Sequence, residues 1–258
     1  MKTLFKATPI LLMALGLLST PVAAMSDVPD TANYGQQQMT YPGTLDYVEG
    51  TAHLDGQLLN DHELHNVSMQ PGQVLTTQTG KVEIVLMPGV YLRVGDHSAV
   101  RMISPDIADT KVQVLRGEAG VEVDELHAEN DLQIVDGKFT THLVEKGFYE
   151  FTANPPRVRA FSGEAEVAAL GRGYEEVKGG HEMALVSGAM QNAPKFNFSH
   201  AQDDLYRWSK LRSQYQAEAN NQMMDEYGLG WGPGYWGGPG WGPGFWGGWG
   251  WGWGGPWW

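Results

Sequence analysis

The sequence predicts an all-β fold, an antiparallel β-sandwich or β-roll with quasi-repeated hairpins, followed by one C-terminal amphipathic helix and a disordered Gly/Trp-rich tail. Between residues 44 and 190, runs of about five apolar and β-branched residues recur about every 8–12 residues between Gly turns, which is typical of antiparallel sheets. A motif of Gly, any residue and Ala occurs three times, at Gly50–Ala52, Gly117–Ala119 and Gly163–Ala165. A regular solenoid is the second choice.

Each copy of the motif lies between two apolar runs, in Tyr47–Leu54, Lys111–Val123 and Ala160–Val167. We expect each copy to be a hairpin with its turn at the Gly. The run Val82–Met87 is rich in β-branched residues and should be a central strand. The pair Asp136-Gly137 is a strong hairpin turn.

Composition excludes several classes of function. The chain of 258 residues contains no Cys, so it has no disulfide framework, thiolate metal site or Cys nucleophile. Its formal net charge is −13. An acidic chain repels phosphate backbones and anionic lipid headgroups, so we expect no nucleic-acid partner.

The first 24 residues resemble a secretory signal peptide. Lys2 and Lys6 precede the apolar run Ile10–Leu18, and small residues lead up to Ala24. That run is too short to span a bilayer, and no other span is expected in the mature chain. We therefore expect cleavage after Ala24 and a periplasmic or extracellular protein. Residues 25–43 are polar and should form a flexible lead-in.

Residues 199–227 predict one helix. Ser199 and Gln202 fit a capping box, and an apolar stripe at helical spacing follows, consisting of Leu205, Trp208, Leu211, Arg212, Tyr215, Ala219 and Met223. The stripe is interrupted by Arg212 and should pack on an open face of the β body. Alternatively, it docks another protein. The candidate partner-binding residues outside the tail are Arg101, Leu205, Trp208, Leu211 and Tyr215.

Residues 228–258 form a tail of Gly, Trp and Pro with few other residues. The decapeptide WGPGYWGGPG at Trp231–Gly240 recurs as WGPGFWGGWG at Trp241–Gly250. Gly and Pro oppose regular structure, whereas indole rings favour interfaces. The tail is either disordered without a ligand or an adhesive segment, with candidate binding residues Trp231, Trp236, Trp241 and Trp246.

The residues indicate no catalytic, cofactor or metal site. His62 and His65 lack the spacing of a metalloprotease and an evident third ligand. The acidic residues Glu118, Glu122, Asp124 and Glu125 could include a carboxylate pair for glycoside hydrolysis. A solvated sheet edge that discourages aggregation is the preferred interpretation. We therefore expect a protein that is not an enzyme.

The order of several short motifs resembles the β-rich domain of FecR-like proteins. The resemblance covers roughly Leu45–Val186 and rests on the segments VEGTA at Val48–Ala52, PGQVL at Pro71–Leu75, VGDHSAV at Val94–Val100 and LRGEA at Leu115–Ala119. It implies a periplasmic β domain that passes a signal between envelope proteins. The leader replaces the anti-sigma segment and membrane span of such relatives, so we expect an exported, soluble form.

Two functions follow as alternatives. The first is a non-enzymatic exported FecR-like module for protein interaction or signal sensing in the cell envelope, with an envelope protein as partner. The second is a carbohydrate-binding or surface-adhesion protein that uses its aromatic tail on a cell-surface glycan. Exposed strand edges would also permit self-association.

Overall fold

The computed structural model describes residues 41–59, 64, 66–169, 173–186 and 193–227, with only the backbone of residues 219–227. The predicted lead-in up to residue 40 and the Gly/Trp-rich tail lie outside this part. The strands are β1 (Thr44–Leu54), β2 (Gln57–Leu58), β3 (Val74–Met87), β4 (Val90–Val94), β5 (Ala99–Asp106), β6 (Asp109–Arg116), β7 (Glu118–Val123), β8 (Asp131–Asp136), β9 (Phe139–Leu143), β10 (Gly147–Ala153), β11 (Pro156–Ala160), β12 (Glu164–Ala169), β13 (Tyr174–Lys178) and β14 (His181–Ala184).

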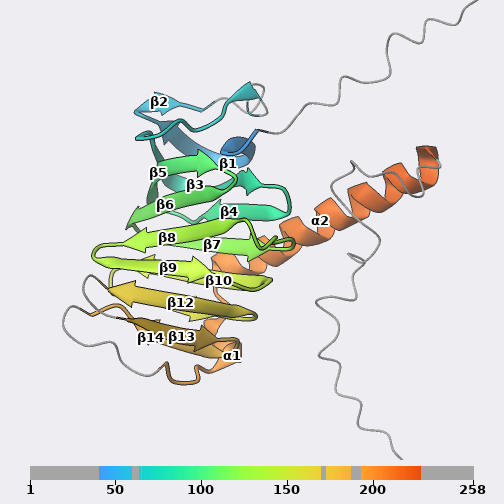
Figure 1. Cartoon of the computed structure of the whole chain (residues 1–258). Coiled ribbons are helices and arrows are strands. Elements are labelled where there is room, and N and C mark those ends of the chain that lie inside the picture. Colours follow the sequence, from blue (N-terminus) through green and yellow to red (C-terminus); the bar gives the residue numbers. More distant parts are fainter. Residues whose placement is uncertain (1–40, 60–63, 65, 170–172, 187–192, 228–258) are drawn as a thin grey trace, which may run out of the picture. The chain divides into compact units, whose positions relative to one another are not determined.

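Among the described residues, all 14 strands belong to one sheet that folds into two layers (Figure 1). The front layer contains β5, β6, β8, β9, β12 and β13, and the back layer contains β4, β7, β10, β11, β14 and the second half of β3. The long strand β3 connects the layers, because Val74 pairs with β5 whereas Val82 pairs with β4. The all-β prediction is therefore confirmed, as is the C-terminal helical region.

One strand pair departs from the predicted antiparallel pattern. β6 and β8 pair in parallel, with Val112 opposite Ile134. Between them the chain crosses to the back layer as β7, so β8 returns to the front layer in the direction of β6. The hairpin at Asp136-Gly137 joins β8 to β9 as predicted.

The Gly-x-Ala motifs are corners and bends, and the prediction of hairpins at these three places was wrong. β6 does not pair with β7, and β11 does not pair with β12, so the chain crosses between the layers at Gly117 and Gly163. Gly50 lies inside β1, next to a bulge. A Cβ on Gly117, whose φ is +73°, would lie 2.1 Å from Ser98 Oγ, so the corner requires Gly. The Ala two residues later is buried in each copy.

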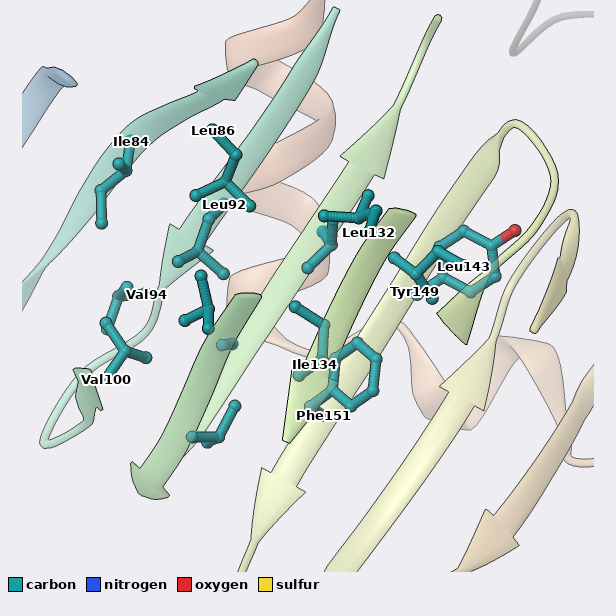
Figure 2. Packing of buried hydrophobic residues seen from close by; sticks show 14 of the residues in the cluster. Ile84, Leu86, Leu92, Val94, Val100, Leu132, Ile134, Leu143, Tyr149 and Phe151 are labelled. Carbon is teal, nitrogen blue, oxygen red and sulfur yellow. The ribbon is translucent and has the colours of Figure 1, made fainter. Parts of the chain in front are cut away.

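The core lies between the two layers (Figure 2). Ile84, Leu92 and Tyr149 project inward from the back layer, and Leu132 and Ile134 meet them from the front layer. Successive residues of a strand point to opposite faces of the sheet. In β3, β4, β7 and β10, the residues that alternate with these core residues therefore face outward. That outer face carries the candidate site.

The C-terminal region contains two helices, α1 (Phe198–Ala201) and α2 (Asp204–Tyr227), where the sequence predicted one. The predicted cap at Ser199 was wrong: the N-cap of α1 is Asn197, whose side chain accepts from the His200 amide. Asp203 accepts at Oδ1 from the Tyr206 amide at 2.9 Å and starts α2. In the part of the chain described above, no helix is both long and apolar enough to cross a membrane.

Replacing Leu92 by Ala should destabilise the fold by about 2–5 kcal/mol, because Leu92 is fully buried and the cavity would remain. The control is Leu115→Ala, at a side chain that is 36% exposed, where we expect a loss of about 0.5 kcal/mol or less. Urea unfolding followed by far-UV circular dichroism measures both. Equal losses would contradict the placement of Leu92 between two packed layers.

Candidate functional site

A row of charged residues crosses the outer face of the back layer. Consecutive strands place in register Glu83, Arg93, Gly120, Glu150, Arg159 and Glu182. The charges alternate in sign on either side of Gly120, and opposite charges on neighbouring strands attract. Gly120 leaves space for the ring of Phe148, which would lie 2.9 Å from an added Cβ.

Arg93 is the centre of the first half of this row. It is 0% exposed, and its Nε donates to Glu83 at 2.7 Å while its Nη1 donates to Glu122 of β7. Burial acts to raise the pKa of Glu83, but Arg93 and Arg212 hold that pKa below its ordinary value. Burial likewise acts to lower the pKa of Arg93, and Glu122 and Glu83 together raise it above its ordinary value. Glu83 and Arg93 are therefore both charged at neutral pH.

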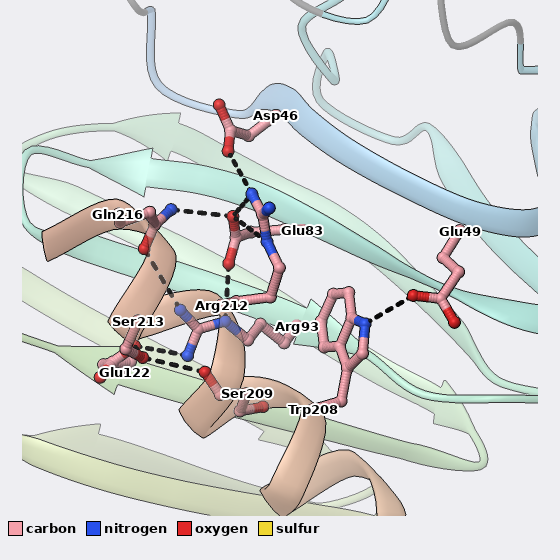
Figure 3. A network of polar contacts seen from close by, with 10 residues as sticks. All are labelled: Asp46, Glu49, Glu83, Arg93, Glu122, Trp208, Ser209, Arg212, Ser213 and Gln216. Atoms are coloured by element: carbon pink, nitrogen blue, oxygen red, sulfur yellow. Dashed lines mark hydrogen bonds and ion pairs between the residues drawn. The ribbon is translucent and has the colours of Figure 1, made fainter. Parts of the chain in front are cut away.

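Helix α2 covers this cluster with polar side chains (Figure 3). Arg212 Nη2 donates to Glu83 at 2.7 Å and to Asp46 of β1 at 3.2 Å. Gln216 Nε2 donates to Glu83 at 2.8 Å, and the Ser213 hydroxyl donates to Glu122 at 2.5 Å. Among the described strand residues, Arg93 is the cation that pairs with both buried carboxylates, and Arg212 adds a second positive charge from the helix.

The guanidinium of Arg212 also contacts an aromatic ring of β1. It lies 4.1 Å from the centroid of the Tyr47 ring, within the range of a cation–π contact. Trp208 lies beside Tyr47, with ring centroids 6.2 Å apart, and donates from Nε1 to Glu49 at 2.9 Å. At the start of the helix, Asp204 pairs with Lys81 at 2.6 Å. The register of the helix on the sheet is thus fixed at several points.

The predicted partner-binding residues separate into different environments. Leu205 is buried, Trp208 is half-buried, and Leu211 and Tyr215 are 44% and 55% exposed. Arg101 lies on β5, exposed, and donates to Gln113 at 3.1 Å, away from α2. Trp231, Trp236, Trp241 and Trp246 lie outside the described residues. The helix packs on an open face of the β body, as predicted.

The nature of that packing differs from the prediction. The contact is centred on Arg212, the residue that interrupts the predicted apolar stripe, whereas Leu211 and Tyr215 of that stripe are exposed. Strand alternation could have identified Glu83 and Arg93, since each is the one charged residue in an apolar run. The pairing with the helix had no sequence signal.

The acidic segment around β7 also required correction. A solvated sheet edge was expected at Glu118, Glu122, Asp124 and Glu125, but β7 is paired on both sides, with β4 and β10. Glu122 is 2% exposed and binds Arg93. Burial, with help from the charge of Glu122, raises the pKa of Asp124 to about 7. His62 and His65 lie outside the described residues, and within those residues no group of three or more His, Asp or Glu is placed to hold a metal ion.

Aromatic side chains pack the start of α2 and the segment before it against the sheet. The Phe161 and Tyr206 rings stack with centroids 4.4 Å apart, and Phe148 meets Tyr206 edge-on at 5.6 Å. Phe196 and Phe198 pack on Phe161 at 5.2 and 5.5 Å. Such pairs add about 0.5–1.5 kcal/mol beyond area burial. This aromatic cluster provides the main apolar contact between the helical region and the sheet.

Comparison with known proteins gives limited similarity. No family model and no curated protein matches the sequence. Two crystal structures described as a "putative anti-sigma factor" from Parabacteroides distasonis ATCC 8503 match part of this chain. They share 13% and 12% sequence identity, with TM-scores of 0.40 and 0.39, over 48% and 47% of this chain. The matched regions span 59% and 57% of those chains, less than two thirds of their length.

Replacing Arg93 by Met should destabilise the protein by about 3–5 kcal/mol, because it leaves Glu83 and Glu122 as buried carboxylates with too little positive charge. Adding Glu83→Gln and Glu122→Gln to that variant should recover part of the loss. The matched control is Arg101→Met on the exposed face of β5, which should change stability by no more than about 0.5 kcal/mol. Chemical denaturation gives the free energy of unfolding of all three variants and of the wild type. Similar losses at both arginines would contradict the structural role of the buried cluster.

Proposed function

We propose that the protein is a non-enzymatic, exported FecR-like module that binds a protein partner or senses a signal in the cell envelope. The export leader at residues 1–24 and the FecR-like motif order support the location and the class. The observation that carries the proposal is the helix-binding face of the back layer. This face binds the chain's own helix α2 through paired charges.

The chemistry of that face suits recognition better than stability. Buried ion pairs contribute little net stability, because desolvation offsets their attraction, but they fix one arrangement of the groups. The single carboxylate of Glu83 accepts hydrogen bonds from Arg93, Arg212 and Gln216. If α2 shifted along its axis, the bonds from Arg212 and Gln216 would be lost together. The sheet therefore holds α2 in one register and presents the opposite side of the helix consistently.

The opposite side of α2 is the proposed partner surface. Leu211 and Tyr215 are four residues apart and lie on one side of the helix, both exposed. Beyond Gln216 the helix continues to Tyr227 and extends past the strands (Figure 1). Helices that present apolar residues at such spacing bind grooves in partner proteins. Arg101 on the front layer is a separate candidate surface.

A photocrosslinking amino acid at Leu211 or Tyr215 should give an adduct with another envelope protein in intact cells, identified by mass spectrometry. The control position is Ile107, in the turn between β5 and β6, which is 44% exposed like Leu211. An adduct from α2 and none from Ile107 is the expected result. Identical adducts from all three positions, or adducts only with copies of the chain, would refute the partner surface.

The alternative function, adhesion to a cell-surface glycan, rests on the repeated decapeptide of the tail. Indole rings stack on sugar rings and accumulate at interfaces. The variant that replaces Trp231, Trp236, Trp241 and Trp246 by Ser should keep its far-UV circular dichroism but lose most of its retention on insoluble polysaccharide. The control is Trp208→Ser, which leaves the tail intact. Retention that is unchanged in the tail variant would eliminate this alternative.

A further inference from the structure

The exposed side of α2 carries positive charge in an otherwise acidic chain. Residues 205–217, LYRWSKLRSQYQA, contain three Arg or Lys and no Asp or Glu, whereas the whole chain has 30 acidic and 17 basic residues. Arg212 is one of the three, and it binds carboxylates of the sheet (Figure 3). The other two, Arg207 and Lys210, are exposed.

These two cations are not part of the contact that holds the helix on the sheet. The side chain of Lys210 forms no ion pair or hydrogen bond with the residues that the structure describes. Arg207 donates from Nη1 to the carbonyl oxygen of Gln202 at 2.7 Å, which is a neutral acceptor. The carboxylate of Asp204, three residues before Arg207, is paired with Lys81 at 2.6 Å. Both cations are therefore available to a partner.

The position of the two cations also disfavours the helix itself. Arg207 lies in the first turn of α2, where the helix dipole favours acidic side chains over basic ones. Lys210 follows three residues later, so two like charges are neighbours on the helix surface and repel. The other neighbours of Lys210 at helical spacing are Tyr206, Ser213 and Gln214, none of them acidic. Lys210 thus adds a charge that stabilises neither the helix nor the sheet, and such local conflicts are expected at functional sites.

Arg207 and Lys210 border the apolar residues of the proposed partner surface. Leu211 lies four residues after Arg207, and Tyr215 lies four residues after Leu211, so these side chains are neighbours along the helix. Leu211 and Tyr215 are 44% and 55% exposed. The next acidic residue, Glu218, comes three residues after Tyr215. Arg207, Lys210, Leu211 and Tyr215 together form a basic–apolar patch.

We propose that the basic–apolar patch binds a groove of an envelope protein that is apolar at its base and acidic at its rim. This inference rests on the proposed function and specifies the chemistry of the partner. Leu211 and Tyr215 would enter the groove, as apolar residues at this spacing do in helix-in-groove complexes. The acidic rim would pair with Arg207 and Lys210. Complementary charges of this kind guide association and select one partner over others.

The charge of the whole chain favours a protein groove over two other occupants. A second copy of the chain, or an anionic membrane, would bring extended negative charge toward a molecule whose formal net charge is −13. Extended like charge opposes such an association. At physiological salt, exposed charges act over about 8 Å. A groove that contacts only this side of α2 would therefore meet mainly its two cations.

The test variant combines Arg207→Glu and Lys210→Glu in the full-length protein, with a photocrosslinking amino acid at Tyr215. Both substituted positions are exposed, and acidic residues suit the first turn of a helix, so the free energy of unfolding should not fall. The control combines Arg116→Glu and Lys138→Glu, which changes the net charge equally. Arg116 is exposed and, like Arg207, donates to one backbone carbonyl, at 3.1 Å. Lys138 is exposed and, like Lys210, has no ion pair with the described residues.

In intact cells, the protein with its native cations should give an adduct with an envelope protein. Mass spectrometry should place this adduct in a partner segment that contains acidic and apolar residues. The variant Arg207→Glu/Lys210→Glu should give at least about tenfold less of the adduct, because the reversal turns attraction to the rim into repulsion. The control Arg116→Glu/Lys138→Glu should give as much adduct as the protein with its native cations.

Equal adduct yields with and without the charge reversal on α2 would overturn the acidic rim but leave the partner surface in place. An equal loss in the control would also overturn it, because net charge alone would then explain the loss. No adduct from the native sequence around Tyr215, or adducts only with copies of the chain, would contradict both this inference and the proposed function. Sedimentation of the purified full-length protein with phosphatidylglycerol vesicles, abolished by the reversal, would assign the patch to a lipid surface instead.

Discussion

The buried guanidinium of Arg93 is the group on which the architecture outside the core depends. It lies between Glu83 and Glu122, which come from the strands on either side of β4. A lone charge buried at this depth would be very unfavourable. Arg93, Glu83 and Glu122 must therefore stay paired once the back layer forms. The remaining negative charge then requires a cation from outside the sheet. Arg212 meets that requirement, which explains why a largely polar helix covers this face.

The two layers of the sheet have correspondingly different surroundings. The inner face follows ordinary hydrophobic packing, with apolar side chains from both layers in contact (Figure 2). The outer face of the back layer has a polar cover, and apolar contact there is concentrated in the aromatic cluster at the start of α2. Polar contacts depend on distance and protonation more steeply than apolar ones do. The helix is therefore more sensitive than the core to changes in solution conditions.

Much of the fold could be predicted from the sequence, because alternation and turn residues are local signals. The strands around Val82–Met87 and the hairpin at Asp136-Gly137 are examples. The layer crossing at Gly117 could not, since a Gly turn looks the same whether the next strand pairs with the last or moves to another layer. The candidate site could not be predicted from the sequence for a related reason. Glu83 and Arg212 were visible as charged residues, but their contact joins positions 129 apart.

That separation has a kinetic consequence. The bond from Arg212 to Asp46 joins residues 166 positions apart, so the chain must close a very long loop before the two ends of the site meet. Proteins rich in such long-range contacts fold slowly. During synthesis from the N-terminus, the residues of β1 and β3 are made long before those of α2. For that interval the carboxylates of Asp46 and Glu83 face solvent without their arginine, and a nascent chain carries an open anionic surface that the finished protein conceals.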